Sequence, residues 1–130
     1  MNYIAGLIPK ADVAYLDGTD TIRQAVEKMT FTHYQAMPVL GSQGHYLYSV
    51  SANDILCYLH DRTLSLHDME LIPLSDVPIY RPIMALSIAA TPKEVEDALM
   101  SQNYVSMVDD KGIFIGIITR RSYIEAVRKK

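Results

Sequence analysis

The sequence lacks several features that mark whole classes of protein. Cys57 is the only cysteine, so no intrachain disulfide is possible and a reducing compartment is expected. No apolar run approaches the roughly 18 residues of a membrane-spanning helix. The first residues, MNYIAGLIPK, lack the charged start and the long apolar core of a signal peptide. These absences predict a cytoplasmic protein with no membrane contact.

Excess positive charge and enzyme signatures are also missing. The 130 residues carry 12 lysines and arginines against 15 aspartates and glutamates, a formal net charge of −3, whereas general nucleic-acid binding needs a basic surface. There is no phosphate loop, dinucleotide fingerprint or nucleophile elbow. Cys57, His60 and His67 have a spacing that does not favour a metal site. We therefore expect no catalytic residues, no metal and no nucleic-acid partner.

The most informative stretch covers residues 112–127, GIFIGIITRRSYIEAV. Residues 113–118 form a nearly continuous apolar run, which is typical of a strand buried on both faces. Thr119 is a good helix N-cap, and Tyr123, Ile124 and Val127 then recur at helical spacing. The pattern predicts a buried strand that runs directly into a helix.

Arg120 and Arg121 fall in the first turn of that predicted helix. Two cations there oppose the helix dipole, with no evident local compensation, and a broken local rule often marks a functional site. Free amide groups at a helix start, together with two guanidinium groups, suit a phosphate. The alternative is that both arginines are solvated or neutralise Asp109 and Asp110.

The same pattern occurs earlier in the chain. Residues 44–55, GHYLYSVSANDI, are again a glycine-led strand followed by a capped helix, and the two glycines lie 68 residues apart (112 − 44 = 68), as do Ser51 and Thr119. Residues 35–40 match residues 103–108 at this same offset. The chain is therefore interpreted as one structural unit used twice.

Each copy is predicted to run strand, helix, strand, strand, helix. In the first copy the strands cover residues 13–16, 36–40 and 45–50, and the helices start after Asp20 and at Ala52. Prolines in residues 61–82 exclude any long element there, although Leu66, Met69 and Leu71 suit a short helix. In the second copy the strands cover residues 85–88, 104–108 and 113–118, and the first helix starts at Thr91, about a turn shorter than its counterpart.

This organisation resembles a tandem pair of cystathionine-β-synthase (CBS) motifs. The resemblance rests on Ala36-Met37-Pro38-Val39, Ser51-Ala52-Asn53-Asp54 and Gly116-Ile117-Ile118-Thr119. More narrowly, residues 13–14, 34–39 and 116–121 are similar to small stand-alone bacterial CBS proteins that bind cyclic di-AMP. The resemblance implies an α/β (α+β) fold with two tandem βαββα motifs packed about a pseudo-twofold axis. The first motif would cover residues 1–60, the linker 61–82 and the second motif 83–130.

The resemblance also implies two nucleotide clefts, each drawing on both motifs. One would combine adenine-binding residues of the first motif with the start of the last helix: Asp12, Ala14, Gln35, Ala36, Pro38, Thr119, Arg120 and Arg121. The other would combine Ser51, Asp54, Ala85 and Ser106, with Asp54 as the ribose ligand. Two positions depart from the family pattern, because Tyr48 replaces a glycine and Ser122 replaces the second ribose aspartate. Ser51 and Asp54 also fit a simple capping box.

The function expected from these features is regulatory nucleotide sensing. The leading ligand is cyclic di-AMP, with AMP, ADP or ATP as the alternative, and the signal would pass to an unidentified regulated protein. A ligand-free dimerisation or protein-interaction module is the other alternative. Partly covered apolar helix faces, such as Ile55 with Leu59 or Ile124 with Val127, predict a homodimer.

Overall fold

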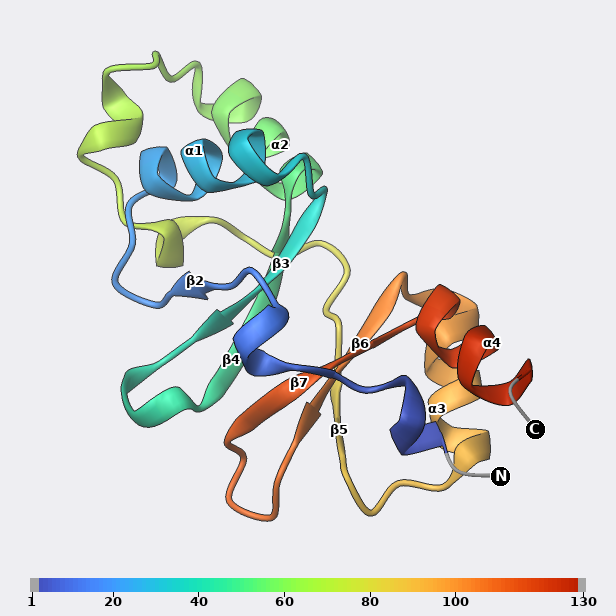
Figure 1. Cartoon of the computed structure of the whole chain (residues 1–130). Helices are drawn as coiled ribbons and strands as arrows, with labels where there is room; N and C mark the ends of the chain where they lie inside the picture. The colour runs from blue at the N-terminus through green and yellow to red at the C-terminus, as the bar shows by residue number, and fades with distance from the viewer. Residues whose placement is uncertain (1–2, 129–130) are drawn as a thin grey trace. The chain divides into compact units, whose positions relative to one another are not determined.

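The computed structural model describes residues 3–128 (Figure 1). The predicted first and second motifs extend into residues 1–2 and 129–130, which lie outside this described part. In chain order the elements are η1 (Tyr3–Gly6), β1 (Ile8–Pro9), η2 (Lys10–Asp12), β2 (Leu16–Asp17), α1 (Ile22–Thr32), β3 (Ala36–Leu40), η3 (Ser42–Gly44), β4 (Tyr46–Ser51), α2 (Ala52–Arg62), η4 (Asp68–Glu70), η5 (Leu74–Asp76), β5 (Ala85–Ser87), α3 (Pro92–Ser101), β6 (Tyr104–Val108), β7 (Phe114–Thr119) and α4 (Arg120–Arg128), where η marks a 3-10 helix.

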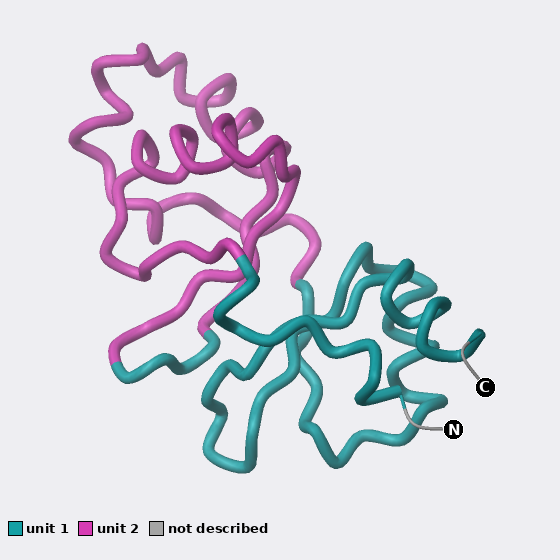
Figure 2. The backbone as a smooth tube through the Cα atoms, viewed as in Figure 1, with its two compact units in different colours: residues 1–13, 43–46, 83–130 teal, residues 14–42, 47–82 magenta. Residues whose placement is uncertain are grey.

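The chain divides into two compact units (Figure 2). Unit 1 comprises residues 1–13, 43–46 and 83–130, and unit 2 comprises residues 14–42 and 47–82. The orders β2-α1-β3-β4-α2 and β5-α3-β6-β7-α4 confirm the predicted repeat and the mixed α+β class. The strand β1 pairs antiparallel with β7, so the segment before Ala14 packs with the second copy of the repeat.

Unit 2 contains a three-stranded sheet in the order β2-β3-β4. One face of α1 carries Ile22, Ala25 and Met29 at helical spacing, and these residues are buried in the core of unit 2. The predicted cap was wrong by one residue: the hydroxyl of Thr21 accepts the Gln24 amide, and the Gln24 side chain accepts the Thr21 amide. The Asp20 carboxylate instead accepts the amide of Asp17 in the preceding turn, 3.0 Å away.

The strand predicted at residues 13–16 lies further along, at Leu16–Asp17. These two residues pair in parallel with Val39 and Leu40 of β3. The ladder therefore begins one residue after Pro38, which has no N–H to contribute. Pro38 is thus tolerated in the middle strand of the sheet because β2 is so short.

Unit 1 contains the four-stranded sheet β1-β7-β6-β5. The capping box predicted at Thr91 is confirmed, but α3 has ten residues against eleven in α1, so it is not a turn shorter. Burial in β7 alternates: Phe114, Gly116 and Ile118 are buried, whereas Ile115 and Ile117 are half-buried. The expectation of a strand fully buried on both faces was therefore wrong, and one face of this strand keeps some solvent contact.

The segment between the copies forms only the short helices η4 and η5. Met69, Leu74 and Val77 are buried and complete the core of unit 2. Leu66 and Leu71, which were expected to pack beside Met69, are exposed. No helix within residues 3–128 is long and apolar enough to cross a membrane.

Candidate functional site

The start of α4 is built around a reciprocal cap. The Ser122 amide donates to the Thr119 hydroxyl, and the Thr119 amide donates to the Ser122 hydroxyl, both at 2.9 Å. The hydroxyl of Ser122 also donates to the Thr119 carbonyl at 3.2 Å. Ser122 therefore closes a capping box in which serine takes the place of the usual acid. The amides of Arg120 and Arg121 occupy the first two helical positions, where a helix supplies no acceptor for them.

Arg120 has a partner that local sequence patterns did not indicate. Its Nε donates to the carbonyl oxygen of Leu99 at 2.7 Å. Leu99 lies in the last turn of α3, where helix carbonyls lack an intrahelical partner and the dipole favours a cation. The compensation is therefore not local but comes from another helix: Arg120 opposes the dipole of α4 but complements that of α3.

Arg121 lies differently from its neighbour. Its side chain is 89% exposed, and its Nε contacts the Glu125 carboxylate at 3.0 Å, one helical turn away. Such an exposed pair contributes little to stability. Asp109 instead accepts the amides of Lys111 and Ile113, and these hydrogen bonds lower its pKa. The alternative in which the arginines neutralise Asp109 was therefore wrong.

Asp12 belongs to the same compact unit as these arginines. It ends η2, which follows directly on β1, and β1 pairs with β7 through Ile8 with Ile117 and Pro9 with Gly116. Asp12 is exposed. The sheet thus brings an N-terminal residue into the unit that carries the start of α4, more than a hundred positions later in the sequence.

The remaining residues predicted for the first cleft lie in unit 2. Ala14 packs against its core, and Ala36 and Pro38 lie in β3. The carbonyl of Gln35 accepts the Ala52 amide at 2.8 Å, which ties the entry of β3 to the start of α2. The assembly of these residues with the start of α4 into one cleft stays a prediction.

The residues predicted for the second cleft also divide between the units. Ala85 and Ser106 are register partners in unit 1. The Ser106 hydroxyl is buried and has no hydrogen-bond partner among the described residues. Ser106 is 0% exposed, so its hydroxyl carries the cost of an unpaired buried polar group and is not open to a ligand.

In unit 2, Asp54 is 5% exposed and both its oxygens are engaged. One oxygen accepts the Ser51 amide at 2.9 Å and the other accepts the Tyr80 amide at 3.2 Å. The Ser51 hydroxyl in turn accepts the Asp54 amide at 3.0 Å, which completes a capping box. The contact with Tyr80 could not be predicted, because it links residues 26 positions apart.

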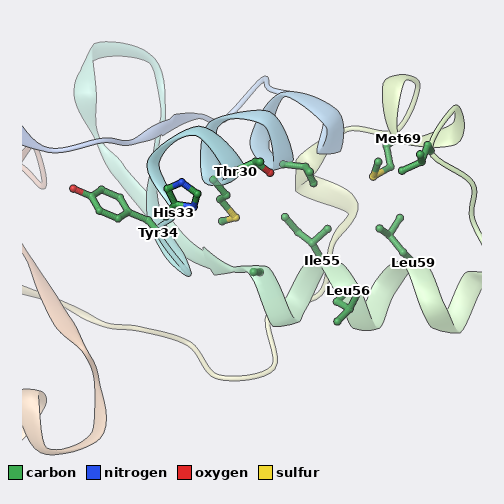
Figure 3. A pocket seen from close by; sticks show the side chains of 11 residues that line it. Thr30, His33, Tyr34, Ile55, Leu56, Leu59 and Met69 are labelled. Carbon is green, nitrogen blue, oxygen red and sulfur yellow. The ribbon is translucent and has the colours of Figure 1, made fainter.

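Each unit also has a groove between its two helices. In unit 2 a groove of about 400 Å3 lies between α1 and α2, and Ile55 and Leu59 point from α2 toward α1 (Figure 3). Ile55 is buried, so its predicted exposure was wrong; the exposed neighbour on α2 is Leu56, at 66%. In unit 1 a groove of about 510 Å3 lies between α3 and α4. Ile124, which lines it, is 52% exposed, in agreement with prediction.

The unit 1 groove also holds a polar contact between its helices. The Tyr123 hydroxyl donates to the Glu96 carboxylate, and burial, this hydrogen bond and the charge of Glu96 together raise the pKa of Tyr123 to about 12. Tyr123 is therefore neutral at physiological pH. No group of three or more histidine, cysteine, aspartate or glutamate side chains that could hold a metal occurs within residues 3–128.

Comparison with known proteins gives a consistent result for the fold. The family model described as "CBS domain" matches residues 5–61 and 74–129. No curated protein sequence shows significant similarity to the chain.

Solved structures match nearly the whole chain. A CbpB in complex with c-di-AMP has a TM-score of 0.85 at 24% identity, covering 95% of this chain and 81% of that one. The CbpB protein of Listeria monocytogenes in complex with c-di-AMP has a TM-score of 0.85 at 22% identity, covering 98% and 96%. A CBS domain protein from Streptococcus pneumoniae has a TM-score of 0.84 at 27% identity, covering 95% and 84%.

Proposed function

The chain belongs to the CBS-domain family, and from this premise we propose that it is a regulatory module that senses an adenine nucleotide. Cyclic di-AMP is the leading ligand, because two structurally similar CbpB proteins hold it. AMP, ADP or ATP is the alternative. As is usual for this family, the role is regulatory rather than catalytic, and the bound state would be passed to a partner protein.

The observation that carries the proposal is the state of Arg120 and Arg121 at the start of α4. In each arginine the Nε has a partner, the Leu99 carbonyl for Arg120 and the Glu125 carboxylate for Arg121. The terminal nitrogens of both have no hydrogen-bond partner among the described residues, so they are open to a ligand. Two guanidinium groups beside unpaired helix amides suit the phosphodiesters of a cyclic dinucleotide, each of which carries one negative charge.

A panel of adenine nucleotides, cyclic dinucleotides and S-adenosylmethionine tests the proposal by thermal shift. At a cyclic di-AMP concentration near 100 times its dissociation constant, we expect a gain of about 2.7 kcal/mol in unfolding free energy. For a domain of this size the melting temperature should rise by several degrees.

The double variant Arg120→Ala, Arg121→Ala should lose most of this shift. Each charge-assisted contact is expected to contribute about 1.5–3 kcal/mol, or one to two orders of magnitude in affinity. A double variant with the full shift would exclude the arginines as phosphate ligands, and a wild-type protein unaffected by every nucleotide would exclude nucleotide sensing.

We further propose that the module is a cytoplasmic homodimer. The dimer is supported by the helix grooves, each of which leaves an apolar side chain exposed, Leu56 in unit 2 and Ile124 in unit 1. These surfaces also favour the alternative function, a module that only contacts proteins. The cytoplasmic location rests on the single cysteine.

A further inference from the structure

We infer that Arg120 couples the anion site at the start of α4 to the last turn of α3, so that a bound phosphate orders the groove between these helices. The inference rests on the proposed function and adds to it a route by which ligand binding changes a protein surface. It involves only residues of unit 1.

The first step is that the Nε of the Arg120 guanidinium is engaged and its two terminal nitrogens are not. This group has five N–H donors in one rigid plane. The Nε donor is engaged by the Leu99 carbonyl at 2.7 Å, which fixes the orientation of the plane. The terminal nitrogens have no partner among the described residues. They can therefore grip a phosphate while the contact with Leu99 stays in place.

The second step is the effect of a phosphate on the contact with Leu99. An unliganded, exposed arginine loses side-chain entropy when it holds one carbonyl, which weakens that contact. A phosphate that already immobilises the guanidinium removes this cost. The contact then becomes stronger, and the last turn of α3 opens less often.

The third step is the surface that this turn carries. Leu99 and Met100 line one side of the unit 1 groove, and Arg120, Tyr123 and Ile124 line the other. Met100 is 82% exposed, so the turn held by Arg120 presents an apolar side chain to solvent. Ligand binding therefore changes the order of an exposed apolar surface, which a protein partner can detect.

The internal repeat provides a comparison within the same molecule. At the offset of 68 residues, the counterpart of Arg120 is Ala52 at the start of α2 (120 − 68 = 52). Alanine has no donor for the end of α1. The coupling is therefore expected in the α3–α4 pair and absent from the α1–α2 pair.

Hydrogen exchange on the full chain, with and without saturating cyclic di-AMP, tests the inference. In the wild type, amide exchange in residues 98–103 should slow about tenfold or more beyond the change in residues 28–33 at the end of α1. This measurement needs no variant. Equal changes at both helix ends, with the ligand bound, would overturn the coupling.

Arg120→Lys and the matched control Arg121→Lys separate coupling from simple contact. Lysine keeps the charge but cannot hold a carbonyl and a phosphate with one rigid plane. In Arg120→Lys, saturating cyclic di-AMP should no longer slow exchange in residues 98–103 selectively. Arg121→Lys should bind the ligand more weakly but keep this selective slowing at saturation, because Arg121 does not contact Leu99. Selective slowing that survives in Arg120→Lys would also overturn the inference. If wild type fails to bind any nucleotide in the thermal-shift panel, the proposed function itself fails.

Discussion

A carboxylate such as Asp54 could bind a ribose, but in the structure both its oxygens accept backbone amides and stabilise the fold. Its buried carboxylate accepts the amides of Ser51 and Tyr80, and so joins the start of α2 to the segment between the two copies. The capping pair with Ser51 could be predicted from their spacing. The tie to Tyr80 could not, because no local pattern relates positions 54 and 80.

The substitution Asp54→Asn separates these two roles. The asparagine side chain keeps the shape but can accept with only one atom, so one of the two part-buried amides loses its partner. We expect the free energy of unfolding to fall by about 1–3 kcal/mol, measured by urea denaturation, with unchanged affinity for cyclic di-AMP. The exposed Asp110 offers the control Asp110→Asn, which should have little effect. A large loss of affinity in a folded Asp54→Asn protein would instead place Asp54 in the ligand site.

Arg120 shows the same limit of local sequence reading. Its position at a helix start indicated an anion site, but its partner Leu99 lies 21 residues away in another helix. Removing two cations from a helix N-terminus would by itself leave the ligand-free protein as stable or slightly more stable. The substitutions also remove the contact between Arg120 and Leu99, which offsets that gain. A small loss of stability in the ligand-free double variant is therefore compatible with a phosphate site at Arg120 and Arg121.

At the scale of elements, predictions succeeded where one local signal dominated and failed where two competed. Thr91, Pro92 and Glu94 are consistent signals for a helix start, and α3 begins there. Asp20 and Thr21 are both good caps, and only the Gln24 side chain decides between them. The apolar residues 13–16 suggested a strand, but register with β3 moved it to Leu16–Asp17.

The antiparallel pairing of β1 with β7 depends on the absence of a side chain at Gly116. A Cβ at this position would overlap the carbonyl oxygen of Ile8 and meet the Leu7 side chain at 3.1 Å. Gly116→Ala should therefore push β1 away and destabilise the protein by about 1–3 kcal/mol. Hydrogen exchange in residues 3–12 should become faster, because their pairing with β7 is lost.

Gly41→Ala is the matched control for this change. The three atoms nearest to a Cβ at Gly41 all belong to the flexible Leu47 side chain, at 3.2 Å or more. It should leave exchange in residues 3–12 unchanged. If Gly116→Ala had the stability and the exchange rates of wild type, β1 would not depend on the close approach of the Ile8 carbonyl to Gly116.

At the scale of the molecule, the internal repeat places equivalent apolar residues on both units. Leu56 on α2 and Ile124 on α4 lie 68 residues apart (124 − 56 = 68) and are 66% and 52% exposed. The repeat itself could be read from the sequence, since glycines, caps and strands recur at a constant offset. The exposed face of α4 at Ile124 was also predicted, but that of α2 was not, because Ile55 rather than Leu56 was expected at the surface.

If a second copy of the chain covers these residues, wild type should have the mass of a dimer by light scattering at micromolar concentration. Leu56→Glu and Ile124→Glu should each shift the mass toward the monomer, because a carboxylate buried at an interface loses its hydration without gaining a partner. Leu71→Glu is the control: Leu71 is 73% exposed but lines neither groove, so this variant should remain a dimer. A monomeric wild type contradicts the homodimer, and dimers that persist in both groove variants place the interface elsewhere.

Arg120 and Ile124 line the same groove, so ligand binding at Arg120 can affect the dimer. If cyclic di-AMP strengthens dimerisation of the wild type but not of Arg120→Lys, ligand binding is connected to assembly.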